Sequence, residues 1–118
     1  MVSLKLLKEL YELAYSLPLS HLKLRTQIIN SGEAIPPLLA EGFAKKRHPK
    51  EAARFYEMAM AESDEVVAHC QKVLILTARF TKIPAAKVKQ LQDGYISLSK
   101  QLNKLVQTWI KFAQVKTR

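Results

Sequence analysis

The residues with the most obvious capacity for chemistry in this 118-residue chain are Glu62, His69 and Cys70. His69 and Cys70 could act as base and nucleophile, but neighbours on a helix point about 100° apart, and such a pair must converge with a third, orienting group. Glu62 lies seven residues before His69 on the same helix face, which allows either a carboxylate–histidine hydrogen bond or an intersubunit contact that fixes register. We expect Cys70 in the core and His69 in a partly polar seam, and we predict no catalytic residues.

The motifs of common enzyme sites are missing from the chain. It contains no H-E-x-x-H, no cysteine pair, no glycine-rich phosphate loop and no G-x-S-x-G. With no further His or Cys at ligand spacing, we expect neither a metal site nor a cofactor. The single cysteine excludes an internal disulfide and suits a reducing compartment. No apolar run approaches the roughly 18 residues of a membrane span, and no signal peptide is recognisable. The sequence therefore predicts a cytoplasmic, non-enzymatic protein that does not enter the membrane.

The net charge of +9 is distributed unevenly along the chain. Residues 1–66 contain nine Lys/Arg and nine Asp/Glu, whereas residues 67–118 contain ten Lys/Arg and one acid, so ten minus one accounts for the whole excess. This asymmetry predicts a polyanionic partner, either nucleic acid or an anionic membrane surface. The alternative is a charged face that only keeps the protein in solution.

The apolar periodicity is helical along the whole chain, which predicts a single all-α domain over residues 1–118. We expect helices over residues 2–17, 21–44 and 49–80, and a fourth from Pro84 almost to the C-terminus. Ser20 is the expected N-cap of the second helix. Pro36 lies inside this helix or at a bend, although proline removes a backbone donor there. Short connections between such helices predict an up-down-up-down four-helix bundle.

Apolar rows indicate how these helices pack. The first helix presents one apolar face: Leu4, Leu7, Tyr11, Ala14 and Leu17. The third helix has a heptad seam and, beside it, a second apolar row of Tyr56, Met60, Val67, Cys70 and Leu74. Two rows on one helix predict a central position, an oligomer or both. The fourth helix carries an unbroken seam typical of bundles: Val88, Leu91, Tyr95, Leu98, Leu102, Leu105, Trp109 and Phe112.

Basic residues from separate parts of the sequence should meet in this bundle. The end of the second helix, the start of the third and the end of the fourth share one pole in an up-down-up-down arrangement. We expect a basic cluster there: Lys45, Lys46, Arg47, Lys50, Arg54, Lys111, Lys116 and Arg118, with Lys5 and Lys8 nearby.

A stripe on the fourth helix is the stronger candidate for binding a polyanion. Lys104, Lys111 and Arg118 recur every seven residues, Lys100 lies beside them, and Asp93 is the only acid on this helix. Such a stripe repels itself unless counterions or a polyanion occupy it. The aromatic residues of this helix lie on its apolar seam, so base stacking of the single-strand type is not expected.

The stretch 35–43 reads Ile-Pro-Pro-Leu-Leu-Ala-Glu-Gly-Phe and is followed by the basic residues 45–47. It resembles the signature I-P-S-N-I-A-E-G-F of a small four-helix-bundle family, departing at Pro37 and Leu38. The family is named after proteins encoded in intervening sequences of large-subunit ribosomal RNA genes. It also takes in the accessory variability determinant, the helper protein of reverse transcriptases in diversity-generating retroelements. The lead-in 22–27 and the residues Arg54, Phe55, Ala59 and Glu65 extend the resemblance over most of the chain.

This resemblance implies more than the residues alone. It implies a cyclic homopentamer of four-helix bundles that binds RNA or DNA and associates with a reverse transcriptase and its template RNA. Glu41 and Glu65 match glutamates of the family pattern, and we expect structural hydrogen bonding from them rather than acid–base work, because nothing identifies a substrate pocket. Two hypotheses follow. The first is an oligomeric nucleic-acid-binding accessory protein that serves a reverse transcriptase. The second is a protein-interaction scaffold whose basic surface meets an acidic protein partner.

Overall fold

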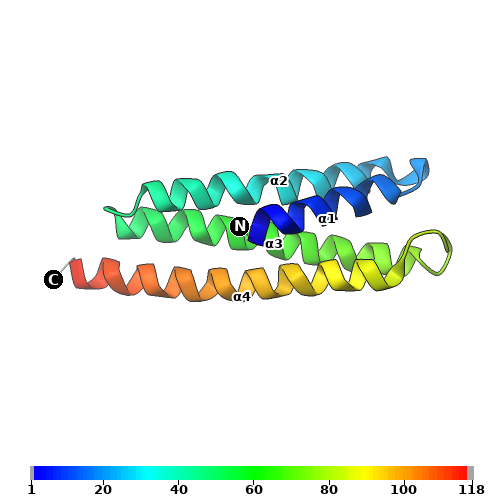
Figure 1. Cartoon of the computed structure of the whole chain (residues 1–118). Helices are drawn as coiled ribbons and strands as arrows, with labels where there is room; N and C mark the ends of the chain where they lie inside the picture. The colour runs from blue at the N-terminus through cyan, green and yellow to red at the C-terminus, as the bar shows by residue number, and fades with distance from the viewer. Residues whose placement is uncertain (1, 117–118) are drawn as a thin grey trace.

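The computed structural model describes residues 2–116, with the side chains of residues 2–115, and this part of the chain is helical throughout apart from its connections. The long helices are α1 (Val2–Ser16), α2 (Leu22–Ala44), α3 (Pro49–Leu76) and α4 (Ala85–Lys116), and a single 3-10 turn, η1 (Leu19–His21), precedes α2. The all-α prediction is confirmed (Figure 1).

Consecutive helices run in opposite directions, so the predicted up-down-up-down bundle is confirmed (Figure 1). Helix α3 packs between α2 and α4, and α1 packs against the other side of both, diagonally opposite α3. The Cα atoms span 57 × 21 × 18 Å. Two poles can be defined. The C-terminal pole comprises the end of α2, the start of α3 and the end of α4. The opposite pole comprises η1 and the loop 77–84.

The first helix is much shorter than the others. It has 15 residues, against 32 in α4, and in Figure 1 it begins near the middle of the bundle and runs to the opposite pole. Near its start Leu6 meets Gly94, where an added Cβ would lie 2.5 Å from Leu6 Cδ2. Gly94 precedes the last residue of α4, Lys116, by 22 positions, or about 33 Å at 1.5 Å per residue. The half of the bundle toward the C-terminal pole therefore contains three helices.

Small residues close the core in this three-helix half. The α3 residues Ala52 and Ala59 are fully buried although no fourth helix covers them. On α2, Gly42 lies so close to α3 that a Cβ there would be 2.7 Å from the Tyr56 ring. Elsewhere the largest fully buried side chains come from all four helices: Leu10, Ile28, Ile35, Val66, Cys70, Val73, Val88 and Tyr95.

The chain turns between α1 and α2 differently from the sequence prediction. Ser20 is not the N-cap of α2: it lies within η1, its hydroxyl bonds His21 Nδ1 at 2.9 Å, and α2 begins at Leu22 without a side-chain cap. Arg25 instead secures this corner. It donates to the backbone carbonyls of Ala14 (3.0 Å) and Leu17 (2.8 Å), which satisfies orphan acceptors at the end of α1.

Three prolines lie at the helix positions that the sequence predicted. Pro36 and Pro37 lie inside α2, as predicted, and Pro49 is the first residue of α3, where a missing N–H costs little. Helix α3 ends at Leu76, four residues before the predicted end. There the Thr77 hydroxyl donates to the Leu74 carbonyl at 2.6 Å and so competes with continued helix formation.

Both apolar rows of α3 are covered within one chain. In the second row Tyr56 and Cys70 are buried, and Met60, Val67 and Leu74 pack half-buried against the core. The rows are thus explained by the central position of α3, one of the two predicted reasons. They provide no independent argument for an oligomer.

Candidate nucleic-acid interface

The residues with catalytic potential are held apart or buried. Cys70 is fully buried, and burial raises the pKa of its thiol to about 12. His69 is half-buried, and its pKa is lowered, first by burial and then by the charge of Lys72. His69 Nδ1 has no hydrogen-bond partner among the described residues, so the hydrogen bond considered between Glu62 and His69 is not formed. The expected placement of Cys70 in the core and of His69 in a partly polar seam is confirmed.

A carboxylate pair joins α3 to α2. Ser31 donates to Glu65 Oε2 at 2.9 Å, which confirms a structural hydrogen bond for Glu65. The pKa of Glu62 is raised, mainly by burial and further by the charge of Glu65. The other glutamate of the family pattern, Glu41, is exposed and makes no side-chain hydrogen bond in the described part of the chain. Residues 2–116 contain no group of three His, Cys, Asp or Glu side chains suited to a metal ion.

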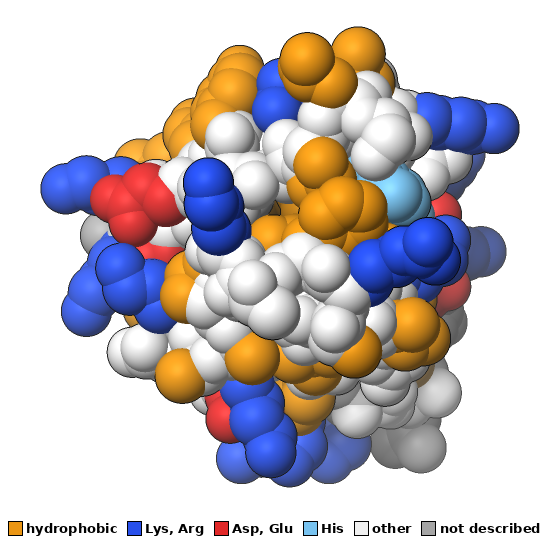
Figure 2. All heavy atoms as spheres, turned by 90° about the vertical axis from the view of Figure 1, so that its right-hand side faces the viewer, with side chains coloured by type: hydrophobic (Ala, Val, Ile, Leu, Met, Phe, Trp, Pro, Cys, Tyr) orange, Lys and Arg blue, Asp and Glu red, His pale blue; other side chains and the backbone are white. Residues whose placement is uncertain are grey.

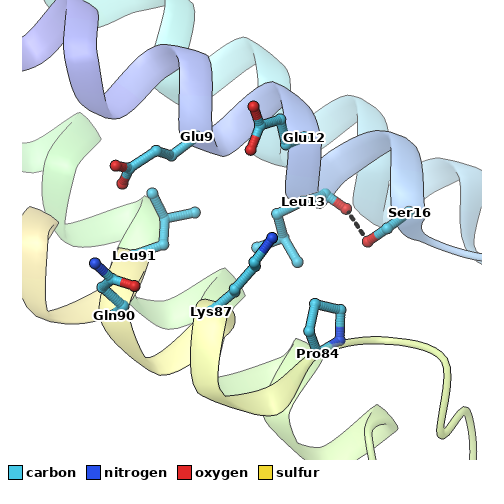
Figure 3. A pocket seen from close by; sticks show the side chains of 8 residues that line it. All are labelled: Glu9, Glu12, Leu13, Ser16, Pro84, Lys87, Gln90 and Leu91. Carbon is cyan, nitrogen blue, oxygen red and sulfur yellow. Dashed lines mark hydrogen bonds between the residues drawn. The ribbon is translucent and has the colours of Figure 1, made fainter.

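A cleft of about 330 Å³ between α1 and α4 brings opposite charges together (Figure 3). Glu9 and Glu12 lie on its α1 wall, and Lys87 points into it from α4, above an apolar floor that includes Leu13 and Leu91. Glu9 and Glu12 therefore lie near Lys87, which is the first basic residue of α4. The cleft is unsuited to an anionic ligand.

The basic stripe of α4 has no such neighbours. Lys100, Lys104 and Lys111 are all exposed, and they form no ion pair with any described residue. Their position on α4 places them opposite its buried face of Leu91, Leu98 and Leu102, so they project away from the bundle. The structure therefore leaves these positive charges uncompensated on one open face.

The turn between α2 and α3 adds a second basic group. Lys45 is partly neutralised by Glu51, at 3.8 Å. Lys46 lies over the Phe43 ring, 4.9 Å from its centroid, and Arg47 is exposed in the turn. Lys50 and Arg54 line a cleft of about 480 Å³ between α3 and α4. The sequence could not predict this cleft, since it depends on how the two helices pack. The floor of this cleft is apolar: Ala53, Ile110 and Ala113.

The predicted cluster is only partly assembled. Lys5 and Lys8 do not lie near the C-terminal pole, because the short α1 starts near the middle of the bundle (Figure 1). Lys116 ends α4, but its side chain lies outside the described residues, as does Arg118. Lys111 belongs to both the pole and the stripe, whereas Lys100 lies farther along α4. The described candidates are therefore Lys45, Lys46, Arg47, Lys50, Lys100, Lys104 and Lys111.

The opposite pole is also basic, which sequence reasoning missed. Figure 2 shows Lys and Arg side chains around this end, with acidic side chains at only a few places and an apolar patch beside a histidine. Lys23 and Lys72 line a groove of about 560 Å³ between α2 and α3, whose apolar side chains are aliphatic: Leu24, Ile75 and Leu76. The packing of α2 against α3 creates this second basic surface. No pattern in the sequence indicates it, because Lys23 and Lys72 are far apart in the chain.

Among the described residues, no helix is both long and apolar enough to cross a bilayer. The model of one protein family, the 23S rRNA-intervening sequence proteins, matches residues 1–104. No curated protein and no solved structure matches the chain. The family match covers α1 to α3 and most of α4, and the four-helix architecture agrees with it. The chain therefore belongs to the 23S rRNA-intervening sequence protein family, a family of small four-helix proteins.

Proposed function

We propose that this protein is a non-enzymatic accessory protein that binds RNA or DNA through α4 and the C-terminal pole. The observation that carries the proposal is the stripe of Lys100, Lys104 and Lys111, which is exposed and unpaired within the described residues. The name of the family supports a link to RNA. Cys70 and His69 support no reaction, because the thiol is buried in the core and the imidazole Nδ1 has no hydrogen-bond partner among the described residues.

The physics of such a stripe favours a polyanion over a single small anion. Lysines at seven-residue spacing stand about 10.5 Å apart along the helix, so one small ion reaches only one of them. A nucleic-acid backbone offers a phosphate every few ångströms and engages several ammonium groups at once. Each neutralised phosphate releases counterions, so affinity should fall steeply with salt.

The resemblance supports two finer proposals. The first is a cyclic homopentamer, which would repeat the basic face around a ring and raise apparent affinity by multivalency. Light scattering tests it, since five chains of 13.4 kDa have a mass of about 67 kDa, and a monomer would refute it. The second is association with a reverse transcriptase and its template RNA. Its test is co-purification with a retroelement reverse transcriptase expressed in the same cells.

The main test compares two double charge reversals of equal size. Lys104→Glu/Lys111→Glu alters the proposed interface, and Lys23→Glu/Lys72→Glu alters the opposite pole. Each replaces two positive charges by two negative ones and so takes the net charge of the chain from +9 to +5. All four side chains are exposed, so circular dichroism should stay unchanged for both variants.

We expect the α4 variant to lose most of its affinity for a labelled RNA and to flatten the plot of log K against log salt by about 1 to 2 units. The opposite-pole variant should lose much less. Equal losses would show that net charge alone governs binding and would refute the assignment to α4. If the wild-type protein binds no nucleic acid at low salt, the scaffold hypothesis with an acidic protein partner replaces the proposal.

A further inference from the structure

Four aromatic side chains lie at the C-terminal pole, and three of them, Tyr56, Trp109 and Phe112, form a continuous row. On α4, Trp109 and Phe112 meet edge to face with ring centroids 5.5 Å apart. Trp109 also stacks on Tyr56 of α3, at 6.4 Å and 29°. Tyr56 in turn lies against Gly42 of α2, and the next residue of α2 is Phe43. Helices α3 and α4 thus share one row of rings, and α2 adds Phe43 beside the glycine that the Tyr56 ring approaches.

Two of these four rings are open to solvent. Phe112 is 51% exposed and Phe43 is 66% exposed, whereas Tyr56 is buried. The cause is the length of α1. The seam of α4 is buried as far as Leu102, but α1 does not reach past the region of Gly94, so no fourth helix covers the last turns. The sequence-based expectation that these aromatics are hidden in the seam is therefore wrong for Phe112.

Cations accompany the exposed rings at this pole. Lys46 lies 4.9 Å from the Phe43 centroid, and Lys111 immediately precedes Phe112. Residues 41–57 and 104–115 together contain seven Lys/Arg and three Glu, a net charge of +4 at this pole. Exposed rings among phosphate-binding groups are the combination that single-stranded nucleic acids require, because each unpaired base has a π face and each linkage a negative charge.

We propose that the C-terminal pole binds single-stranded RNA or DNA, with unpaired bases stacked on Phe43 and Phe112 and the phosphates held by the neighbouring cations. This inference rests on the proposed function and narrows its substrate class. A duplex keeps its base faces stacked internally and can use only the cations. Lys111, Trp109 and Phe112 lie beyond residue 104, so the α4 part of this surface is outside the family match, whereas Phe43 and Tyr56 lie within it.

The opposite pole matches this combination less well. Its most exposed apolar side chains are aliphatic, namely Leu19 at 78% and Ile75 at 75% exposure, but Tyr15 near the end of α1 is 66% exposed and lies under the guanidinium of Arg25. Aliphatic groups offer no π face for a base. Leu19 and Ile75 therefore provide an aliphatic control, on a second basic surface, for the two exposed phenylalanines.

The experiment measures the affinity of the full chain for fluorescein-labelled oligouridylate and for an RNA hairpin of equal length. Phe43→Leu/Phe112→Leu removes the rings but keeps apolar side chains, and Leu19→Ala/Ile75→Ala is the matched control. We expect the phenylalanine variant to bind the single strand about tenfold more weakly or worse, with hairpin affinity changed less than about twofold. The control should bind both RNAs as the wild type does.

Trp109, the only tryptophan, supplies an independent readout. A base stacked on Phe112 would lie beside the indole, so oligouridylate should quench its emission in the wild type and quench it less in the phenylalanine variant. Unchanged single-strand affinity in that variant, or a wild-type preference for the hairpin, would overturn this inference. If only the Lys104→Glu/Lys111→Glu variant loses binding, the proposed function stands and base stacking is excluded. Base stacking would also be excluded if the Trp109 emission changed only because the protein self-associates and buries the indole, without RNA.

Discussion

Replacement of Gly42 by alanine should destabilise the protein, although alanine is the better helix former. Gly42 lies in α2, where alanine would stabilise by about 1 kcal/mol. Its new Cβ would lie 2.7, 2.8 and 3.0 Å from three carbons of the Tyr56 ring, whereas ordinary contacts are 3.4–4 Å. The ring must therefore move by about 0.7 Å, the difference between 3.4 and 2.7 Å.

This movement is expensive because Tyr56 is nearly buried and stacks on Trp109. Overpacking of this kind costs about 1–3 kcal/mol, so the net loss should be about 0–2 kcal/mol. The melting temperature should fall by up to about 8 °C, and the emission of Trp109 should change with the displaced ring. Thermal unfolding followed by circular dichroism measures the first effect and fluorescence the second.

Gly94→Ala is the matched control. Its Cβ would come within 2.5 Å of Leu6 Cδ2, but the next contact is 3.7 Å away, and the end of a leucine side chain can rotate. We expect its stability to stay within about 1 kcal/mol of the wild type, because the propensity gain offsets a small rearrangement. A further variant, Tyr56→Leu, should remove the penalty of Gly42→Ala. If Gly42→Ala stabilises the protein with unchanged fluorescence, the close approach of α2 to Tyr56 is not rigid and the reasoning fails.

Four further outcomes follow from the structure. Tyr95→Phe should leave stability equal or raise it by up to about 1 kcal/mol in denaturant unfolding, because the buried hydroxyl has no partner among the described residues; a loss above that would indicate a hidden bond. Glu62→Gln should stabilise the protein at neutral pH. The raised pKa of Glu62 means that its favourable contribution exists at low pH and is lost as pH rises through that pKa, so the gain should vanish in acid. Arg25→Lys should lower stability by about 1–3 kcal/mol by breaking the paired bonds to the end of α1, and an unchanged melting temperature would contradict this. Amides of α4 beyond Leu102 should exchange hydrogen faster than those of the four-helix half, and uniform protection would indicate that the C-terminal pole is covered in solution.

The sequence predicted the fold where local signals and packing agree. The seam of α4 is buried from Val88 to Leu102 as its spacing required, and Pro49 begins a helix because proline is favoured in a first turn. The face of α1 was placed about one residue off. Leu4 is 52% exposed, while Leu6 and Leu10 are buried, since several apolar residues in a row fit more than one helical face.

The candidate site was harder to predict because it depends on helix length and pairing. Lys104 and Lys111 could be placed on an outer face because their seven-residue spacing puts them on one side of α4, away from its apolar seam. The partial neutralisation of Lys45 by Glu51 depends on the turn geometry, and the cleft beside Arg54 depends on the packing of α3 against α4. The ion pair and the cleft both depend on how the chain folds in three dimensions. A local sequence pattern does not predict the distances between the side chains involved.

The short first helix explains why the C-terminal pole can be both stable and accessible. A helix that continued along the whole of α4 would cover the seam up to Phe112 and leave only lysines outside. Without it, the core must close with small side chains, and Gly42, Ala52 and Ala59 allow α2, α3 and α4 to meet closely enough to bury the floor. Phe43 and Phe112 are then left exposed at the rim, near the cations. The short α1 therefore accounts for two features of the C-terminal pole. The core is closed by the small residues Gly42, Ala52 and Ala59, and the rings of Phe43 and Phe112 are exposed.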